Sequence, residues 1–168
     1  MFLKSSKYPG IEYEAGEEIF LSPQEAGNYF YLDVDEELTS SDAAMALIAS
    51  TLDEVDALLA TAKEFLKQTL SSKDASHYGT VAYFMEYHRD QLDPDTLAEL
   101  FPSCDPEAMS FAQMVDFLKI VRFGSLIDEE TDQQAFVLDL SFNPELTDEL
   151  LVVYFDLEKQ VVSLAHES

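Results

Sequence analysis

Histidine and cysteine carry out much of the catalysis and metal binding in proteins, and this chain of 168 residues has three histidines and one cysteine. His77 and His88, if they share one helix, are about 16 Å apart and cannot bind one metal ion together. His166 is far along the chain, and the sequence does not show whether it approaches either. Cys104 has acidic neighbours that disfavour its thiolate. No metalloprotease or nucleophile-elbow motif accompanies these residues, so we expect no catalytic residue, no metal site and no cofactor.

The carboxylates of the segment DVDEE have the alternating spacing that a calcium or magnesium site can use. Asp33, Asp35 and Glu37 would be the ligands. The segment lacks the glycine and the distant glutamate of a helix–loop–helix calcium loop. A strand that ends at an acidic helix N-terminus explains the same residues more simply. Divalent metal binding is therefore the less favoured alternative for this segment.

The charge of the chain is extreme and uneven. It has 34 acidic and nine basic residues, for a formal net charge of −25. No lysine or arginine lies between Lys7 and Lys63 or between Arg122 and Lys159, and these two gaps contain 13 and 10 acids. Such a charge disfavours DNA or RNA as a direct ligand and an anionic membrane as a surface. It favours a basic protein partner, and acidity that serves only solubility is the competing explanation.

The first 40 residues have the pattern of strands and turns. Residues 11–22 alternate around Ala15-Gly16, which predicts a hairpin. The segment NYFYLDVD predicts a further strand with one more polar face.

Residues 41–117 change to a helical period. Apolar residues from 48 to 66 recur at spacings of three and four, which predicts a long amphipathic helix. A break near Ser50 is an alternative, because Thr51 and Glu54 have the form of a capping box. A second helix is predicted over residues 76–92.

Two aspartate-proline pairs predict further helix starts, because aspartate is a good N-cap and proline fits the first helical position. Asp93-Pro94 predicts a short helix through Phe101. Asp105-Pro106 predicts a helix that reaches Phe117, either directly or from a new start at Ser110.

Residues 118–168 return to a period of two. Strands are predicted over 118–123, 134–142, 150–156 and 160–166, joined as an antiparallel meander. Both faces of 150–156 are apolar, so we expect this strand to be central and covered on both sides, or covered by helices on one side and by the N-terminal strands on the other.

The predicted fold is therefore α+β, in a single domain of residues 1–168. An antiparallel sheet from the N-terminal hairpin region (1–40) and the C-terminal meander (118–168) packs against a helical middle segment (41–117).

The final segment, TDELLVVYFDLEKQVVSLAHES, with the preceding QQAFVLDLSF, resembles the C-terminal signature of a family of small acidic bacterial proteins of unknown function. The shared features are Thr-Asp, an apolar strand, an acidic turn, a second strand and a closing Glu-Ser. The segment YFMEYHRDQL is compatible with that family. The resemblance implies an α+β bacterial cytoplasmic domain and assigns no catalytic residues. The absence of a signal-peptide pattern in residues 1–25 predicts the same compartment.

These observations favour a non-enzymatic module that binds a basic protein, of the kind represented by immunity proteins and enzyme inhibitors. A DNA mimic and an acidic housekeeping domain or homodimer are the alternatives, and the chain is expected to be a monomer or a homodimer. Tyrosines are favoured interface anchors, and those of the aromatic helix are candidates beside the acids. The candidate partner-binding residues are Glu12, Glu14, Glu17, Glu18, Asp33, Asp35, Glu36, Glu37, Tyr83, Tyr87, Asp128, Glu129 and Glu130.

Overall fold

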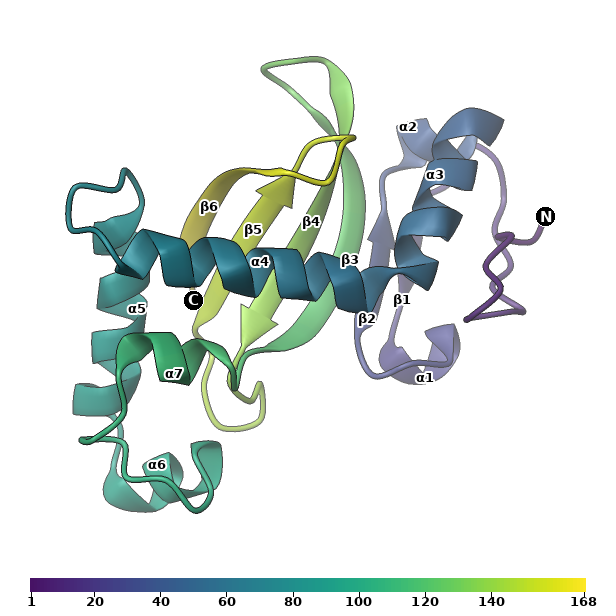
Figure 1. The fold of residues 1–168 in the computed structure, drawn as a ribbon. Helices are drawn as coiled ribbons and strands as arrows, with labels where there is room; N and C mark the ends of the chain where they lie inside the picture. The colour runs from purple at the N-terminus through teal and green to yellow at the C-terminus, as the bar shows by residue number, and fades with distance from the viewer.

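Six strands form one sheet in which the spatial order follows the sequence, in the computed structural model of residues 1–168 (Figure 1). The pairs are antiparallel except β2 with β3, which are parallel. Seven helices accompany the sheet, so the predicted α+β class is confirmed. The strands are β1 (Ile19–Leu21), β2 (Tyr31–Val34), β3 (Lys119–Asp128), β4 (Gln133–Ser141), β5 (Leu150–Phe155) and β6 (Val161–Glu167).

Four of the seven helices, α1, α3, α6 and α7, begin after a residue whose side chain caps the helix. Asp93 accepts a hydrogen bond from the Thr96 amide and confirms the predicted start of α6. Ser110 forms a capping box with Gln113, so the last helix starts at Ser110 and not at Asp105. The helices are α1 (Pro23–Ala26), α2 (Glu36–Thr39), α3 (Asp42–Asp53), α4 (Val55–Leu70), α5 (Tyr78–Gln91), α6 (Pro94–Leu100) and α7 (Phe111–Val115).

The core lies between one face of the sheet and the helices. α4 runs across the front of the strands in Figure 1, with α5 and α7 beside it. Alternate strand residues such as Phe123, Leu138 and Val153 are fully buried and belong to this core. The intervening residues, such as Arg122 and Tyr154, point to the opposite face, over which Figure 1 shows no helix.

The predicted N-terminal hairpin is wrong. Glu12 forms a bridge with Phe2, and β1 pairs with β2 instead of with residues 11–13. Residues 1–40 also contain α1 and α2 in addition to strands. The alternation around the glycine turn predicted that residues 11–13 would pair with the strand that follows them. Instead, the chain after β1 continues through α1 into β2, and β1 pairs with β2.

Two other predictions need correction. The helical stretch is in two pieces, as the alternative had it, but the break is at Glu54, and Thr51 is buried inside α3 and caps nothing. The strand of residues 150–155 lies between β4 and β6, and the N-terminal strands do not cover it. They extend the same sheet at its far edge.

Asp53 fixes the N-terminal segment to α3. Its carboxylate accepts hydrogen bonds from the Ser5 and Ser6 hydroxyls and from the amides of Ser6 and Lys7. Burial alone would raise the pKa of Asp53, but these hydrogen bonds outweigh it and lower the pKa to about 2. The segment before the sheet is thus held by side-chain bonds more than by strand pairing.

None of the helices combines the length and apolar character that crossing a membrane requires.

We predict that Val153→Asp prevents folding, because Val153 is fully buried between β4 and β6. An unpaired buried carboxylate costs several kcal/mol, close to the whole stability of such a domain. The matched control is Val162→Asp on β6, where the side chain is 53 % exposed. Thermal unfolding followed by circular dichroism measures both variants, and an unchanged melting temperature for Val153→Asp would contradict the packing described here.

Candidate functional site

The pairing of β1 with β2 brings the acids that precede β1 close to the acids of α2. Ile19 is opposite Val34 in the β1–β2 pair, so Glu17 and Glu18 lie beside the start of α2. The Gly16 amide donates a 3.0 Å hydrogen bond to the Thr39 hydroxyl at the end of α2, which fixes this neighbourhood. The acids before β1 and the acids of α2 therefore share one end of the sheet.

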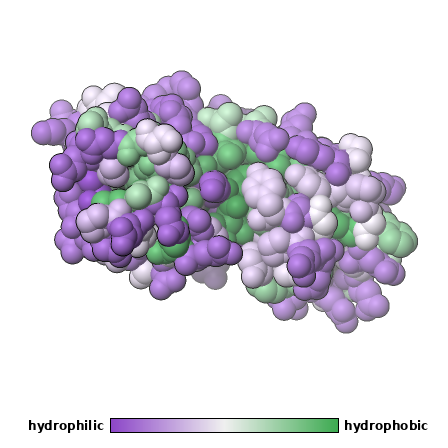
Figure 2. Space-filling view, turned by 90° about the horizontal axis from the view of Figure 1, so that it is seen from below, coloured by the Kyte–Doolittle hydropathy of each residue, from purple (hydrophilic) through white to green (hydrophobic).

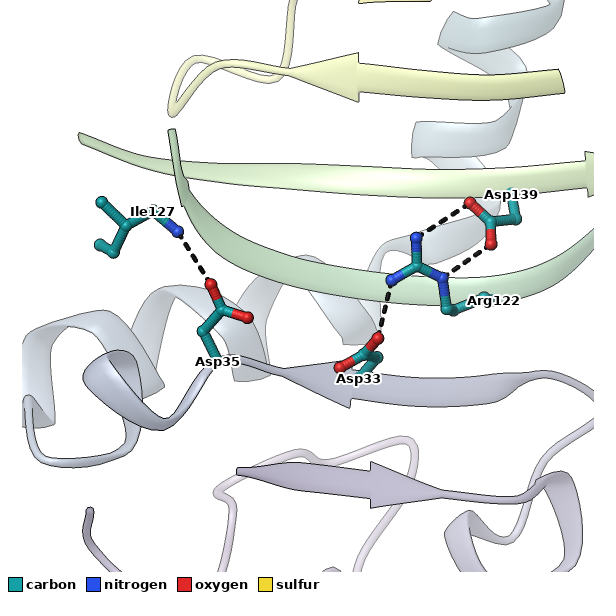
Figure 3. Close-up of polar contacts among 5 residues, drawn as sticks. All are labelled: Asp33, Asp35, Arg122, Ile127 and Asp139. Carbon is teal, nitrogen blue, oxygen red and sulfur yellow. Dashed lines mark hydrogen bonds and ion pairs between the residues drawn. The ribbon is translucent and has the colours of Figure 1, made fainter. Parts of the chain in front are cut away.

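The parallel partner of β2 adds a third acidic segment to the same end. Val34 is opposite Ser125 on β3, and the Asp35 amide donates to the Ser125 carbonyl. The Asp35 carboxylate accepts from the Ile127 amide at 3.3 Å (Figure 3), immediately before the β3–β4 turn. We call the resulting group the acidic end. It consists of Glu17, Glu18, Asp35, Glu36, Glu37, Asp128, Glu129 and Glu130.

No lysine or arginine forms an ion pair with the acidic end. The six salt bridges that lysine and arginine side chains form all use other acids. All residues of the acidic end except Asp128 are exposed. Its carboxylates therefore produce a negative field that the protein itself does not neutralise.

A groove runs along β1 at the border of the acidic end. It has a volume of ≈ 370 Å³ and is open to solvent. We call it the β1 groove. Its lining residues are Glu12, Tyr13, Glu14, Glu17, Glu18, Ile19, Phe20 and Leu21. Four of the predicted partner-binding acids therefore surround one hollow in the surface.

Asp33 is not part of this negative surface. It points to the uncovered face of the sheet and binds Arg122 Nη1 at 2.8 Å, while Asp139 binds Arg122 Nε at 2.7 Å and Nη2 at 3.1 Å (Figure 3). Burial lowers the pKa of Arg122, but the two carboxylates raise it more, so the net shift is upward. Asp33 therefore serves to join β2, β3 and β4.

Gly124 makes room for this ion triad. It lies opposite Asp33 and two residues after Arg122 on β3, and a Cβ atom there would be 3.2 Å from Arg122 Nη1 and 2.9 Å from Val137 Cγ1. The bare backbone lets the guanidinium lie flat across the sheet. Sequence reasoning missed the triad, although one arginine in a strand with aspartates at matching positions of two other strands was a usable signal.

The metal alternative finds no geometric support. Asp33 binds Arg122 and Asp35 binds a backbone amide, so the alternating carboxylates turn to different partners. No group of three or more histidine, cysteine, aspartate or glutamate side chains is placed to hold a metal ion.

The two candidate tyrosines are remote from the acidic end. Tyr83 and Tyr87 are on α5, at the opposite side of the molecule from α2 (Figure 1). Tyr83 is 60 % exposed and lies with Tyr87 beside Glu86 and Asp90 in a shallow depression. The structure therefore divides the predicted partner-binding residues between two separate surfaces.

The structure answers the open question about His166. Its ring lies 5.3 Å from the Phe84 ring, which also contacts His88 at 4.4 Å, so two histidines flank one phenylalanine. His166 Nε2 is 2.6 Å from a Glu149 oxygen. His77 stands apart at the start of α5. His88 lies against the core rings Phe84 and Phe142, and His166 lies between Phe84 and the exposed Tyr83, so both histidines serve in packing.

His88 is fully buried, and burial favours the neutral form of its ring. Nδ1 donates to the Phe84 carbonyl at 2.8 Å, and in the neutral ring Nε2 accepts from the Thr147 hydroxyl at 3.0 Å. Burial lowers the pKa of His88, and the bond to Phe84 and the charge of Glu149 offset part of this. Charging the ring would remove its acceptor and leave a buried cation.

Comparisons with protein-family models, curated proteins and solved structures found no significant match to this chain. The resemblance of residues 133–142 and 147–168 to small acidic bacterial proteins therefore stays a prediction.

We predict that Arg122→Met destabilises the fold by about 2 kcal/mol, because it leaves Asp33 and Asp139 facing each other without a cation. The matched control is Lys67→Met, whose partner Asp116 is largely exposed, and about 0.5 kcal/mol is expected there. Urea denaturation measures both. Equal effects would show that the triad does not stabilise the sheet.

We predict that His88 titrates below 6.5 in the folded protein. Since the folded pKa is depressed, the neutral ring contributes stability above pH 6.5, and that contribution decreases as the pH falls below 6.5. Proton NMR of the ring measures the titration, with His88→Asn as the assignment control. A midpoint above 6.5 would contradict the buried neutral ring.

Proposed function

We propose that this protein is a non-enzymatic module that binds a basic protein partner, in the manner of an immunity protein or inhibitor. The observation that carries the proposal is the acidic end. The fold gathers three acidic segments there, and no lysine or arginine of the chain pairs with them. A negative surface that a protein leaves unneutralised can steer and hold a positively charged partner.

The distribution of the basic residues supports a surface role beyond solubility. Solubility requires net charge but no particular arrangement of it. Here Lys7, Lys67, Arg89 and Lys159 pair with acids elsewhere, such as Asp56. The acids of α2 and of the β3–β4 turn remain free and exposed. An arrangement that concentrates free carboxylates on one end fits a cationic ligand better than a general solvation need.

The proposal predicts that the immobilised protein retains a basic protein from native lysate at low salt and releases it at high salt. Replacing Glu17, Glu18, Glu36 and Glu37 by glutamine should reduce retention at least about tenfold, since several charge pairs of about 0.5 kcal/mol each are lost. Pull-down with salt elution and quantitative mass spectrometry measures this. Stability of the variant should be equal or higher, because self-repulsion decreases.

The matched control replaces Glu99, Glu107, Glu145 and Glu158 by glutamine. These side chains are exposed, form no ion pair and change the net charge by the same amount. Retention that falls equally in both variants would mean that only net charge matters. A wild-type protein that retains no basic protein at low salt would contradict the proposed function.

A further inference from the structure

We propose that the basic partner binds at the free edge of β1 as an extended segment that adds a strand to the sheet. This inference rests on the proposed function and specifies where and how the partner binds. Strand addition uses main-chain hydrogen bonds for affinity and neighbouring pockets for selectivity. Both features are present at β1.

The backbone of β1 has an unoccupied edge. β1 is the first strand of the sheet and has β2 as its one neighbour. Beyond the bonds to β2, no hydrogen bond reaches the backbone of Ile19, Phe20 or Leu21. An antiparallel strand pair leaves outward amide and carbonyl groups on each side, and an incoming strand can bind them.

The groove beside this edge is negatively charged. Glu12, Glu14, Glu17 and Glu18 line the β1 groove, all four are exposed, and none forms an ion pair with a basic side chain. Lysine or arginine side chains of an added strand would meet these carboxylates in the β1 groove. The charge therefore selects a basic segment over an acidic or neutral one.

An exposed aromatic pair lies next to the same edge. Phe20 is 57 % exposed and Tyr31 is 39 % exposed, and their rings are 5.9 Å apart on the uncovered face of the sheet. Neither ring belongs to the core. An added strand would place alternate side chains over Phe20, so an apolar residue there would bury it. Figure 2 shows hydrophilic residues over most of the surface on the side it displays, with hydrophobic residues gathered toward the middle of that side.

The other free edge of the sheet lacks this combination. β6 carries Glu167 as its one acid, and the depression with Glu86 and Asp90, whose Tyr83 contacts His166 of β6, is lined by residues of α5 and not by the strand. Val162 is exposed there, but α5 packs next to this strand. The β6 edge therefore serves as the internal control for the β1 edge.

The test uses a blocked eight-residue peptide of alternating lysine and valine, titrated into the full chain at low salt by calorimetry. Two further peptides are methylated on the backbone: one on the amide nitrogen of every valine, the other on the amide nitrogen of every lysine. In an extended strand these two sets of N–H groups point to opposite edges. Strand addition predicts that one methylated peptide binds about tenfold more weakly and that the other binds like the parent.

The matched variants are Phe20→Ser at the β1 edge and Val162→Ser at the β6 edge. We expect Phe20→Ser to weaken binding of the parent peptide several-fold and Val162→Ser to leave it unchanged. Equal binding of the three peptides, or a larger effect of Val162→Ser, would overturn strand addition at β1. If the peptides bind equally and glutamine replacement at the acidic end still abolishes protein retention, the proposed function survives without this inference. If the parent peptide does not bind, the inference fails, and the lysate result alone then decides the proposed function.

Discussion

The parallel pairing of β2 with β3 joins the two ends of the chain into one sheet, and most other features of the molecule depend on it. Two parallel neighbours cannot be connected by a tight turn, so the chain between Val34 and Lys119 must cross over the sheet. The helices α2–α7 occupy that crossover and cover the face on which the core forms. Arg122 secures the pairing from the other face by binding carboxylates on β2 and β4.

The same pairing explains how a chain of this charge can fold with so many acids close together. The acids of the acidic end lie at strand ends, helix starts and a turn, where they are exposed to water and counterions. Water screens repulsion between exposed charges much more than the protein interior does. The acids that lie toward the sheet interior, Asp33 and Asp139, have Arg122 between them. The protein therefore separates two kinds of carboxylate, one neutralised within the fold and one left free at its end.

Much of the fold could be predicted from local pattern. The spacing of apolar residues changes from a strand pattern to a helical one near residue 41 and back near residue 118. Asp93 and Ser110 cap helices, as the sequence around each of them indicated. The N-terminal hairpin failed because alternation specifies a strand but does not specify its partner. The site was harder to predict, since the meeting of Glu17, Glu36 and Glu129 depends on a register between segments about ninety residues apart. The sequence indicated these acids as candidates. Only the tertiary structure shows that Tyr83 lies on a different surface and that Asp33 binds Arg122.

The crossover also determines the order in which the protein can be completed during synthesis. β1 and β2 leave the ribosome long before β3, and a two-stranded pair is at best marginally stable alone. β2 therefore lacks its second neighbour in the sheet until the segment that contains Arg122 has been made. Until then β1 and β2 form an acidic two-stranded segment that lacks its pairing with β3. Its many like charges keep it from associating with other copies during that interval.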